Sequence, residues 1–326
     1  MLILAGDIGG TKTNLAVFSH EQGLHDPIAE QTYVSANYAN LETMAQEFLA
    51  KTGLRVERAA FGVAGPVIAG AARITNLPWV MEEAKLRAAL GIESVRLLND
   101  LESIANAVPL LEPADVSKLN DLEPAPQGSI GVIAPGTGLG VAFLVWTQTG
   151  YTAFASEGGH ADFAPGNELE SDLQRYLQRR YGRVSYERVI SGLGIPNIYA
   201  FLRDGFYVPE SQWVAEQLAG AHDPTPVIVT NALIETPDPL CARVMEIFAS
   251  VLAAKAGNLG LTVMATGGIY LGGGIPPRIL PLLRRESFMN IFRFKGRLSN
   301  LMGQIPVRVI LNTKSGLLGA ARVAIG

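Results

Sequence analysis

The sequence is poor in cysteine and histidine. Cys241 is the only cysteine among its 326 residues, and the four histidines are scattered. A single cysteine excludes an intrachain disulfide, and so few sulfur and imidazole ligands disfavour a structural zinc site. A chain without disulfides is typical of a reducing compartment. We therefore expect a cytoplasmic protein that holds no zinc, with Cys241 in the core.

Charged residues are also scarce, at 17% of the chain, and the net charge is −4. Without an excess of positive charge there is no electrostatic basis for binding nucleic acid or a membrane surface. No uninterrupted apolar run approaches the roughly 20 residues of a membrane span. The apolar segment 1–4 is too short for the core of a signal peptide. The hydrophobic content of 48% instead predicts a large buried core, and the length allows two domains.

Two common nucleotide-binding motifs are missing. The P-loop requires G-x-x-x-x-G-K followed by Ser or Thr, and it leads into a helix. Lys12 and Thr13 resemble its end, but Thr11 stands where the motif has glycine. The dinucleotide-binding pattern G-x-G-x-x-G is also absent. Any phosphate loop in this chain must therefore be of another kind.

One such loop is predicted near the beginning of the sequence. Apolar residues 1–5 and 15–18 flank a glycine-rich turn, which predicts a strand, a tight turn and a second strand. Glycines let the backbone approach a ligand, and consecutive N–H groups can form an anion-binding concavity. Asp7 would repel a bare phosphate but would tolerate one that carries Mg²⁺, bound directly or through water. The predicted phosphate site comprises Gly6, Asp7, Ile8, Gly9, Gly10 and Thr11, although a hairpin without a ligand is the simpler alternative.

The same pattern recurs more than a hundred residues later. Apolar runs 130–134 and 139–145 flank Gly136, Thr137 and Gly138. Two strand–turn–strand units so far apart suggest two related lobes, each offering a phosphate loop to a shared cleft. A third glycine cluster, at 272–274, follows a predicted strand. Gly273 and Gly274 would then border the adenosine of a nucleotide, although a plain strand-to-helix loop is the alternative.

Between these turns the sequence predicts alternating strands and helices, which is typical of sheets flanked by helices. The segment 109–129 is rich in Pro, Asp, Glu and Gln and predicts a surface connection, with a domain boundary near residue 110. We expect a helix with apolar spacing over 41–49 and Gly53 as its C-cap. Further helices are expected over 82–90, 101–108, 168–181, 241–259 and 315–324, another beginning at 186, and strands over 58–63, 95–98, 262–271 and 307–311.

Taken in order, these motifs resemble those of the bacterial glucokinase family in the sugar kinase, Hsp70 and actin superfamily. The resemblance covers nearly the whole chain. It excludes the ROK group, because residues 161–165 stand where ROK proteins carry a Cys-rich zinc motif. The motifs that carry it are Gly6–Thr11, Leu98–Asp100, Gly136–Val141, Glu157–Pro165, Glu187–Gly192, Gly272–Pro276 and Ser315–Gly319.

The resemblance implies a two-lobed α/β fold of the actin/hexokinase (ribonuclease H-like) type, with mixed sheets flanked by helices and a cleft between the lobes. A small domain would span 1–110 and a large domain 111–300, with 301–326 returning to the small domain. The implied reaction transfers the γ-phosphoryl group of ATP, with Mg²⁺, to the 6-OH of D-glucose. A homodimer is expected from the resemblance alone.

Asp100 is the predicted general base, because a sugar hydroxyl needs an acceptor for its proton. As an Asn-Asp pair after a strand, Asn99 and Asp100 could instead cap a helix. Asn99, Asp100, Glu157, His160 and Glu187 resemble the sugar-binding residues of the family. Taken alone, His160 would be a buried structural histidine and Glu187 a surface acid at a helix start. Asp162 is expected to support the His160 loop.

Three alternatives remain open on the sequence alone. The chain could phosphorylate another hexose, such as mannose, fructose or an N-acetylhexosamine. It could be an ATPase of the Hsp70 or actin kind, without sugar chemistry. It could also sense a sugar without turning it over. Selective phosphorylation of glucose would separate these possibilities.

Overall fold

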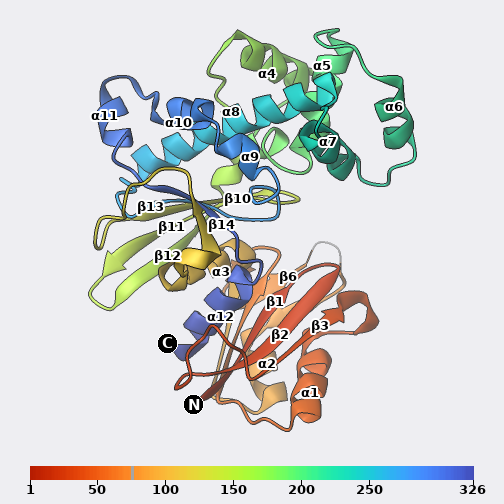
Figure 1. The fold of residues 1–326 in the computed structure, drawn as a ribbon. Helices are drawn as coiled ribbons and strands as arrows, with labels where there is room; N and C mark the ends of the chain where they lie inside the picture. The colour runs from red at the N-terminus through yellow and green to blue at the C-terminus, as the bar shows by residue number, and fades with distance from the viewer. Residues whose placement is uncertain (75–76) are drawn as a thin grey trace. The chain divides into compact units, whose positions relative to one another are not determined.

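A computed structural model describes residues 1–74 and 77–326, which form two compact units (Figure 1). Unit 1 comprises Met1–Asp115, Thr147–Ala155 and Asn312–Gly326. Unit 2 comprises Val116–Trp146 and Ser156–Leu311. Each unit is therefore assembled from segments that are distant in the sequence.

A five-stranded mixed sheet forms the centre of unit 1, in the order β3-β2-β1-β4-β8. The first three strands form an antiparallel meander, and β4 and β8 run parallel to β1. The mixed sheet confirms the predicted fold class. Its strands are β1 (Leu2–Ile8), β2 (Lys12–Ser19), β3 (Ala29–Val34), β4 (Arg58–Val63) and β8 (Ser94–Asn99), and a separate small sheet holds β5 (Val67–Ile68), β6 (Ala71–Arg73) and β7 (Val80–Glu82).

Helices cover both faces of this sheet. Helices α1 (Leu41–Thr52) and α2 (Glu83–Leu90) pack on the face that carries Leu4 and Ile8. The predicted cap of α1 is confirmed, because Gly53 ends it with a φ of 68°. Helices α3 (Asp100–Ala107) and α12 (Ser315–Ile325) lie together at the opposite face, where α12 covers Ile3 and Ala5 (Figure 1). Because side chains alternate along a strand, Asp7 continues the α12 face.

Glycine allows α12 to pack very closely on α3. A Cβ atom on Gly319 would lie 1.7 Å from the carbonyl oxygen of Ser103 and 2.9 Å from the backbone nitrogen of Ala107. One turn earlier, the Ser103 hydroxyl donates to the carbonyl oxygen of Gly316 at 2.7 Å. The contact fixes the position of α3, whose first residue is Asp100.

A second mixed sheet has six strands in the order β12-β11-β10-β13-β14-β9. Strands β10, β13 and β14 are parallel, whereas β11 and β9 run antiparallel to their neighbours β10 and β14. The carboxyl ends of β10 and β13 therefore lie at the same edge, where ligand-binding groups gather in such sheets. The strands are β9 (Val116–Lys118), β10 (Ile130–Pro135), β11 (Leu139–Thr147), β12 (Gly150–Ser156), β13 (Gly268–Leu271) and β14 (Val307–Ile310).

Helix α8 (Pro239–Thr262) is the core helix of unit 2, and Cys241 is fully buried in it. Among the described residues, only this helix is long and apolar enough to cross a membrane, but 61% of its apolar window is buried. That burial is expected of a core helix. The remaining helices of unit 2 are α4 (Glu168–Tyr181), α5 (Gly194–Asp204), α6 (Gln212–Ala219), α7 (Pro224–Leu233), α9 (Leu280–Leu283), α10 (Glu286–Arg293) and α11 (Ser299–Met302).

Two predicted elements are wrong in extent. The strand predicted over 262–271 is only β13, because α8 continues to Thr262 and a turn with Met264 at a φ of 49° intervenes. The helix predicted from Tyr186 is a single 3-10 turn, and α5 begins only at Gly194. Short 3-10 helices occur at η1 (Ser35–Asn37), η2 (Val108–Leu110), η3 (Pro113–Asp115), η4 (Gly158–His160), η5 (Tyr186–Arg188) and η6 (Gly296–Leu298).

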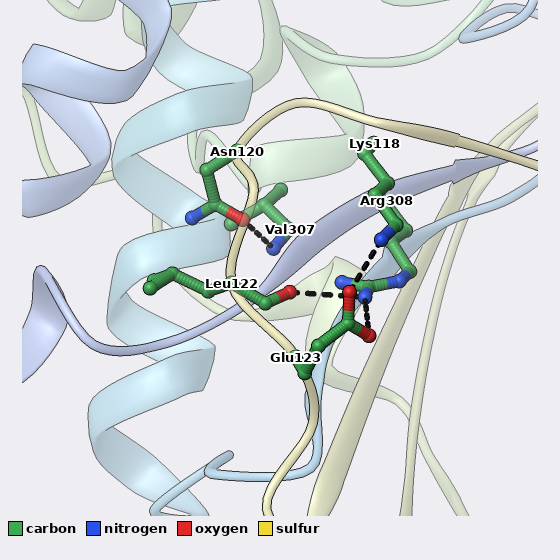
Figure 2. Close-up of polar contacts among 6 residues, drawn as sticks. All are labelled: Lys118, Asn120, Leu122, Glu123, Val307 and Arg308. Atoms are coloured by element: carbon green, nitrogen blue, oxygen red, sulfur yellow. Dashed lines mark hydrogen bonds and ion pairs between the residues drawn. The ribbon is translucent and has the colours of Figure 1, made fainter.

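The connection after β9 is pinned across β14 by polar contacts (Figure 2). The side chain of Arg308 is only 5% exposed and donates to the carbonyl oxygen of Leu122 at 3.0 Å and to Glu123 at 3.1 Å. Lys118 also pairs with Glu123. Asn120 accepts from the backbone N–H of Val307 at 3.1 Å. The predicted surface connection is therefore anchored to the sheet.

Candidate active site

The hydroxyl groups of Ser35 and Thr13 support the first glycine turn. The turn closes with a hydrogen bond from Gly9 N–H to the Lys12 carbonyl oxygen at 3.0 Å. Ser35 Oγ donates to the Gly9 carbonyl oxygen at 2.8 Å and lies 3.0 Å from Thr13 Oγ1. The Ser35 N–H also bonds to the carbonyl oxygen of Thr11. Both hydroxyl residues are fully buried, so the turn is fixed in shape before any ligand arrives.

The environment of Asp7 disfavours the ionised form of its carboxyl group. Burial, with a smaller contribution from the negative charge of Asp100, raises the pKa of Asp7 to about 6. The first turn of α12 lies against it, since a Cβ atom on Gly316 would meet the Asp7 carboxylate at 3.3 Å. The two predicted acidic residues of unit 1 are thus electrostatically coupled.

Asn99 and Asp100 are positioned by the junction of β8 and α3. Asn99 is the N-cap of α3: its Oδ1 accepts from Leu101 N–H at 3.0 Å, and its Nδ2 donates to the Gly65 carbonyl oxygen at 3.1 Å. Asp100 Oδ1 accepts from the same Leu101 N–H at 2.8 Å. The capping alternative is therefore correct for Asn99. It does not exclude a role in binding, because a carboxylate and an amide each keep further hydrogen-bonding capacity.

In unit 2 the second and third glycine turns lie against each other. The Gly272 N–H donates to the Ile133 carbonyl oxygen at 2.8 Å. Gly273 has a φ of 79°, and a Cβ atom there would lie 2.7 Å from the carbonyl oxygen of Pro135. Only glycine permits this approach. The turn at Gly136–Gly138 therefore has the cluster at 272–274 as its neighbour, as a shared nucleotide site requires.

The predicted sugar-binding side chains of unit 2 also converge. His160 Nε2 lies 4.0 Å from Glu157 Oε2 and 3.9 Å from Glu187 Oε1. These separations exceed a direct hydrogen bond, so the polar atoms can still bond to sugar hydroxyls. The side chains of Glu157 and His160 are 76% and 57% exposed, whereas Glu187 is 22% exposed. His160 is thus not the buried structural histidine of the alternative reading.

Arg183 supports the His160 loop and was not predicted from the sequence. Its guanidinium donates to Asp162 Oδ1 at 2.7 Å and to the carbonyl oxygen of His160. Asp162 thus supports the loop as expected, through a partner that no motif marks. Ser35 and Thr13 were missed for the same reason, because isolated polar residues carry no local signal.

One cavity in unit 2 lies apart from the predicted site. A hollow of about 380 Å³ in unit 2 is lined by residues of α4, α8 and α10, including Glu170, Arg243 and Phe288, and by none of the predicted site residues. Nor do the described residues contain a group of three or more His, Cys, Asp or Glu side chains arranged to hold a metal ion. Mg²⁺ in kinase sites needs only one or two carboxylates plus phosphate oxygens and waters, and Asp7 fits that role.

Comparison with known proteins identifies the family. The glucokinase family profile matches residues 4–325. A glucokinase from Nostoc punctiforme is 43% identical over 99% of this chain and 98% of its own length. A glucokinase from Synechocystis sp. is 41% identical over 98% of this chain and 96% of its own length. The chain belongs to the glucokinase family.

Solved glucokinase structures have the same fold. The crystal structure of glucokinase from an Antarctic psychrotroph superposes with a TM-score of 0.85 at 29% identity, covering 99% of this chain and 98% of that one. Glucokinase from Balamuthia mandrillaris, solved in complex with glucose, superposes with a TM-score of 0.82 at 22% identity, covering 100% and 94%. As a glucokinase, the chain is an ATP-dependent hexose kinase that phosphorylates glucose.

Proposed function

We propose that this glucokinase transfers the γ-phosphoryl group of Mg²⁺-bound ATP to the 6-OH of D-glucose with Asp100 as the general base. The position of Asp100 supports this most directly. It lies at the carboxyl end of β8, it is coupled to Asp7 beside the first phosphate turn, and the α3–α12 contact holds its helix. Asp100 and the first phosphate turn belong to unit 1, and the second phosphate turn, Glu157, His160 and Glu187 belong to unit 2.

The role of Asp100 is to accept the proton that the 6-OH loses as its oxygen attacks phosphorus. Positioned bases typically contribute about 10²–10⁴-fold to the rate. Asp100→Asn keeps the size and the cap to Leu101 N–H but is a far weaker base. We expect kcat to fall by about that factor while the dissociation constant for glucose changes much less. Normal turnover by this variant would remove Asp100 as the base.

Asp7 would hold Mg²⁺, directly or through water. When bound, the ion would neutralise part of the negative charge of the phosphates. The chain itself would contribute backbone N–H groups at Gly10 and Thr11 in unit 1 and at Thr137 and Gly138 in unit 2. Gly6 and Ile8 in β1, and Gly9 and Gly136, whose N–H groups close the turns, would shape the phosphate site. Gly273 and Gly274 would border the adenosine of ATP.

The sugar would be bound by Asn99, Asp100, Glu157, His160 and Glu187. Carboxylates accept several hydrogen bonds, and histidine can donate from one nitrogen while it accepts at the other. Sites of this kind reject analogues that lack a hydroxyl, because buried polar groups then remain unpaired. Glu157→Gln should therefore raise the KM for glucose, and an unchanged KM would place Glu157 outside the sugar site.

We further propose that the protein works in the cytoplasm as a homodimer, with small and large domains that correspond to units 1 and 2. The segment boundaries at Asp115 and Asn312 support this division, with residues 147–155 as an addition to the small domain. The absence of disulfide capacity fits a reducing compartment. Light scattering of the purified protein tests the dimer, and a single monomeric species would reject it.

A further inference from the structure

Within unit 2, Glu187 lies next to both the proposed sugar-binding residue His160 and the second phosphate turn. Its Oε1 faces His160 at 3.9 Å, whereas its Oε2 accepts from the backbone N–H of Leu139 at 3.0 Å. Leu139 directly follows the second phosphate turn. One side chain therefore contacts the sugar-binding loop with one oxygen and the nucleotide turn with the other.

The turn is shaped to receive this carboxylate. A Cβ atom on Gly138 would lie only 2.5 Å from Glu187 Oε2, so glycine alone leaves room for it. The segment that follows Glu187 binds the turn at two further points. Gly192 N–H donates to the Gly136 carbonyl oxygen at 2.7 Å, and Leu193 N–H donates to that of Thr137 at 3.3 Å. The position of the turn thus depends on the segment that carries Glu187.

We propose that Glu187 is a positioning residue for the second phosphate turn, in addition to being a sugar ligand. This inference rests on the site assignment under Proposed function. A carboxylate has two oxygens that can accept at the same time, so Oε2 can hold the turn while Oε1 accepts from a sugar hydroxyl. A bound sugar then restrains the carboxylate and, through it, the turn. Glucose and nucleotide therefore bind with a favourable coupling free energy.

Glutamine separates the two roles of this residue. Glu187→Gln keeps the shape of the side chain but offers one acceptor oxygen in place of two. That oxygen can accept from Leu139 N–H or from the sugar hydroxyl, but not from both, and the NH₂ group that replaces the other oxygen cannot accept. Glu157→Gln is the matched control, because Glu157 also faces His160 but no hydrogen bond joins its carboxylate to the turn among the described residues.

The test measures the dissociation constant of a non-hydrolysable ATP analogue with Mg²⁺, with and without saturating glucose. Allosteric couplings are typically about 5- to 150-fold, and we expect the wild-type ratio in this range. In Glu187→Gln the ratio should fall towards one. In Glu157→Gln it should persist once enough glucose is added.

A second variant disturbs the same contact by a change in the phosphate turn. In Gly138→Ala the new methyl group displaces Glu187 Oε2, so a substitution in the nucleotide turn should weaken glucose binding measured without nucleotide. A wild-type ratio of one, an unchanged ratio in Glu187→Gln, or normal glucose affinity in Gly138→Ala would each overturn the inference. Those results would leave the proposed function intact if glucose is still phosphorylated. Failure of the wild-type protein to phosphorylate glucose would instead remove the proposed function itself.

Discussion

Asp7→Asn should stabilise unit 1 at neutral pH. The pKa of Asp7 is raised from 3.8 to about 6, mainly because the carboxylate is buried. At about 1.36 kcal/mol per pKa unit, the folded protein pays up to about 3 kcal/mol to ionise this group. Asparagine has nearly the same shape and cannot ionise. We expect the metal-free variant to gain up to this amount at pH 7 and to lose kinase activity.

The sign of the pH dependence is fixed by the direction of the shift. Below pH 3.8 Asp7 is protonated in both the folded and the unfolded protein, so asparagine brings no gain there. As the pH rises to about 6, the unfolded chain ionises first, and the folded wild-type protein loses stability relative to the variant. The difference between variant and wild type should therefore grow between these two values and remain constant above them.

Urea unfolding in EDTA measures this difference at pH 4, 5 and 7. Trp79 is buried in unit 1, whereas Trp146 and Trp213 belong to unit 2 and are 41% and 42% exposed. In a background with both of the latter changed to Phe, tryptophan fluorescence follows unit 1 alone. Asp26→Asn, at an exposed loop position, is the control and should show no such trend. Equal stability of Asp7→Asn and wild type at pH 7, or a gain independent of pH, would refute the reasoning.

Four further predictions concern packing and ligand binding. Gly319→Ala should lower the unfolding free energy by about 3 kcal/mol or more, because the methyl group meets α3 backbone at 1.7 Å; calorimetry checks this against Gly220→Ala, whose Cβ meets nothing closer than 3.9 Å. Ser35→Ala removes a bond to Gly9 and should raise the KM for ATP by roughly five- to a hundredfold, with the KM for glucose as the internal control. Gly274→Ala meets no protein atom within 4 Å, so a raised KM for ATP without a change in melting temperature would locate the nucleotide there. EDTA should abolish activity and Mg²⁺ restore it, whereas restoration by Zn²⁺ alone would contradict the metal assignment.

Local patterns predicted the turns and most helices, because glycine clusters and the 3.6-residue period are properties of adjacent residues. Helix α1 begins at Leu41 and is capped by Gly53 as predicted, and both bounds of α4 match the predicted range. The strand predicted over 262–271 failed because a short apolar run does not distinguish a buried strand from the end of a buried helix.

Local sequence patterns could not predict the contacts that hold the site together. Ser35 lies 26 residues from its partner Gly9, and Glu187 lies 48 residues from Leu139. Neither distance follows from periodicity or turn chemistry. The burial of Arg308 was equally unpredictable, since a charged residue in a strand gives no sign that a carboxylate 185 positions away will pair with it. The sequence also contains no signal that residues 147–155 belong with unit 1.

The packing of α12 on unit 1 has a consequence for biosynthesis. All five strands of the first sheet are complete at Asn99, yet the helix that covers Ile3, Ala5 and Ala60 begins only at Ser315. The whole of unit 2 must therefore leave the ribosome while one apolar face of that sheet stays uncovered. Domains generally fold in order from the N-terminus during translation, and exposed apolar surface promotes aggregation. For this chain, the unit that is translated first is therefore completed last, when α12 leaves the ribosome.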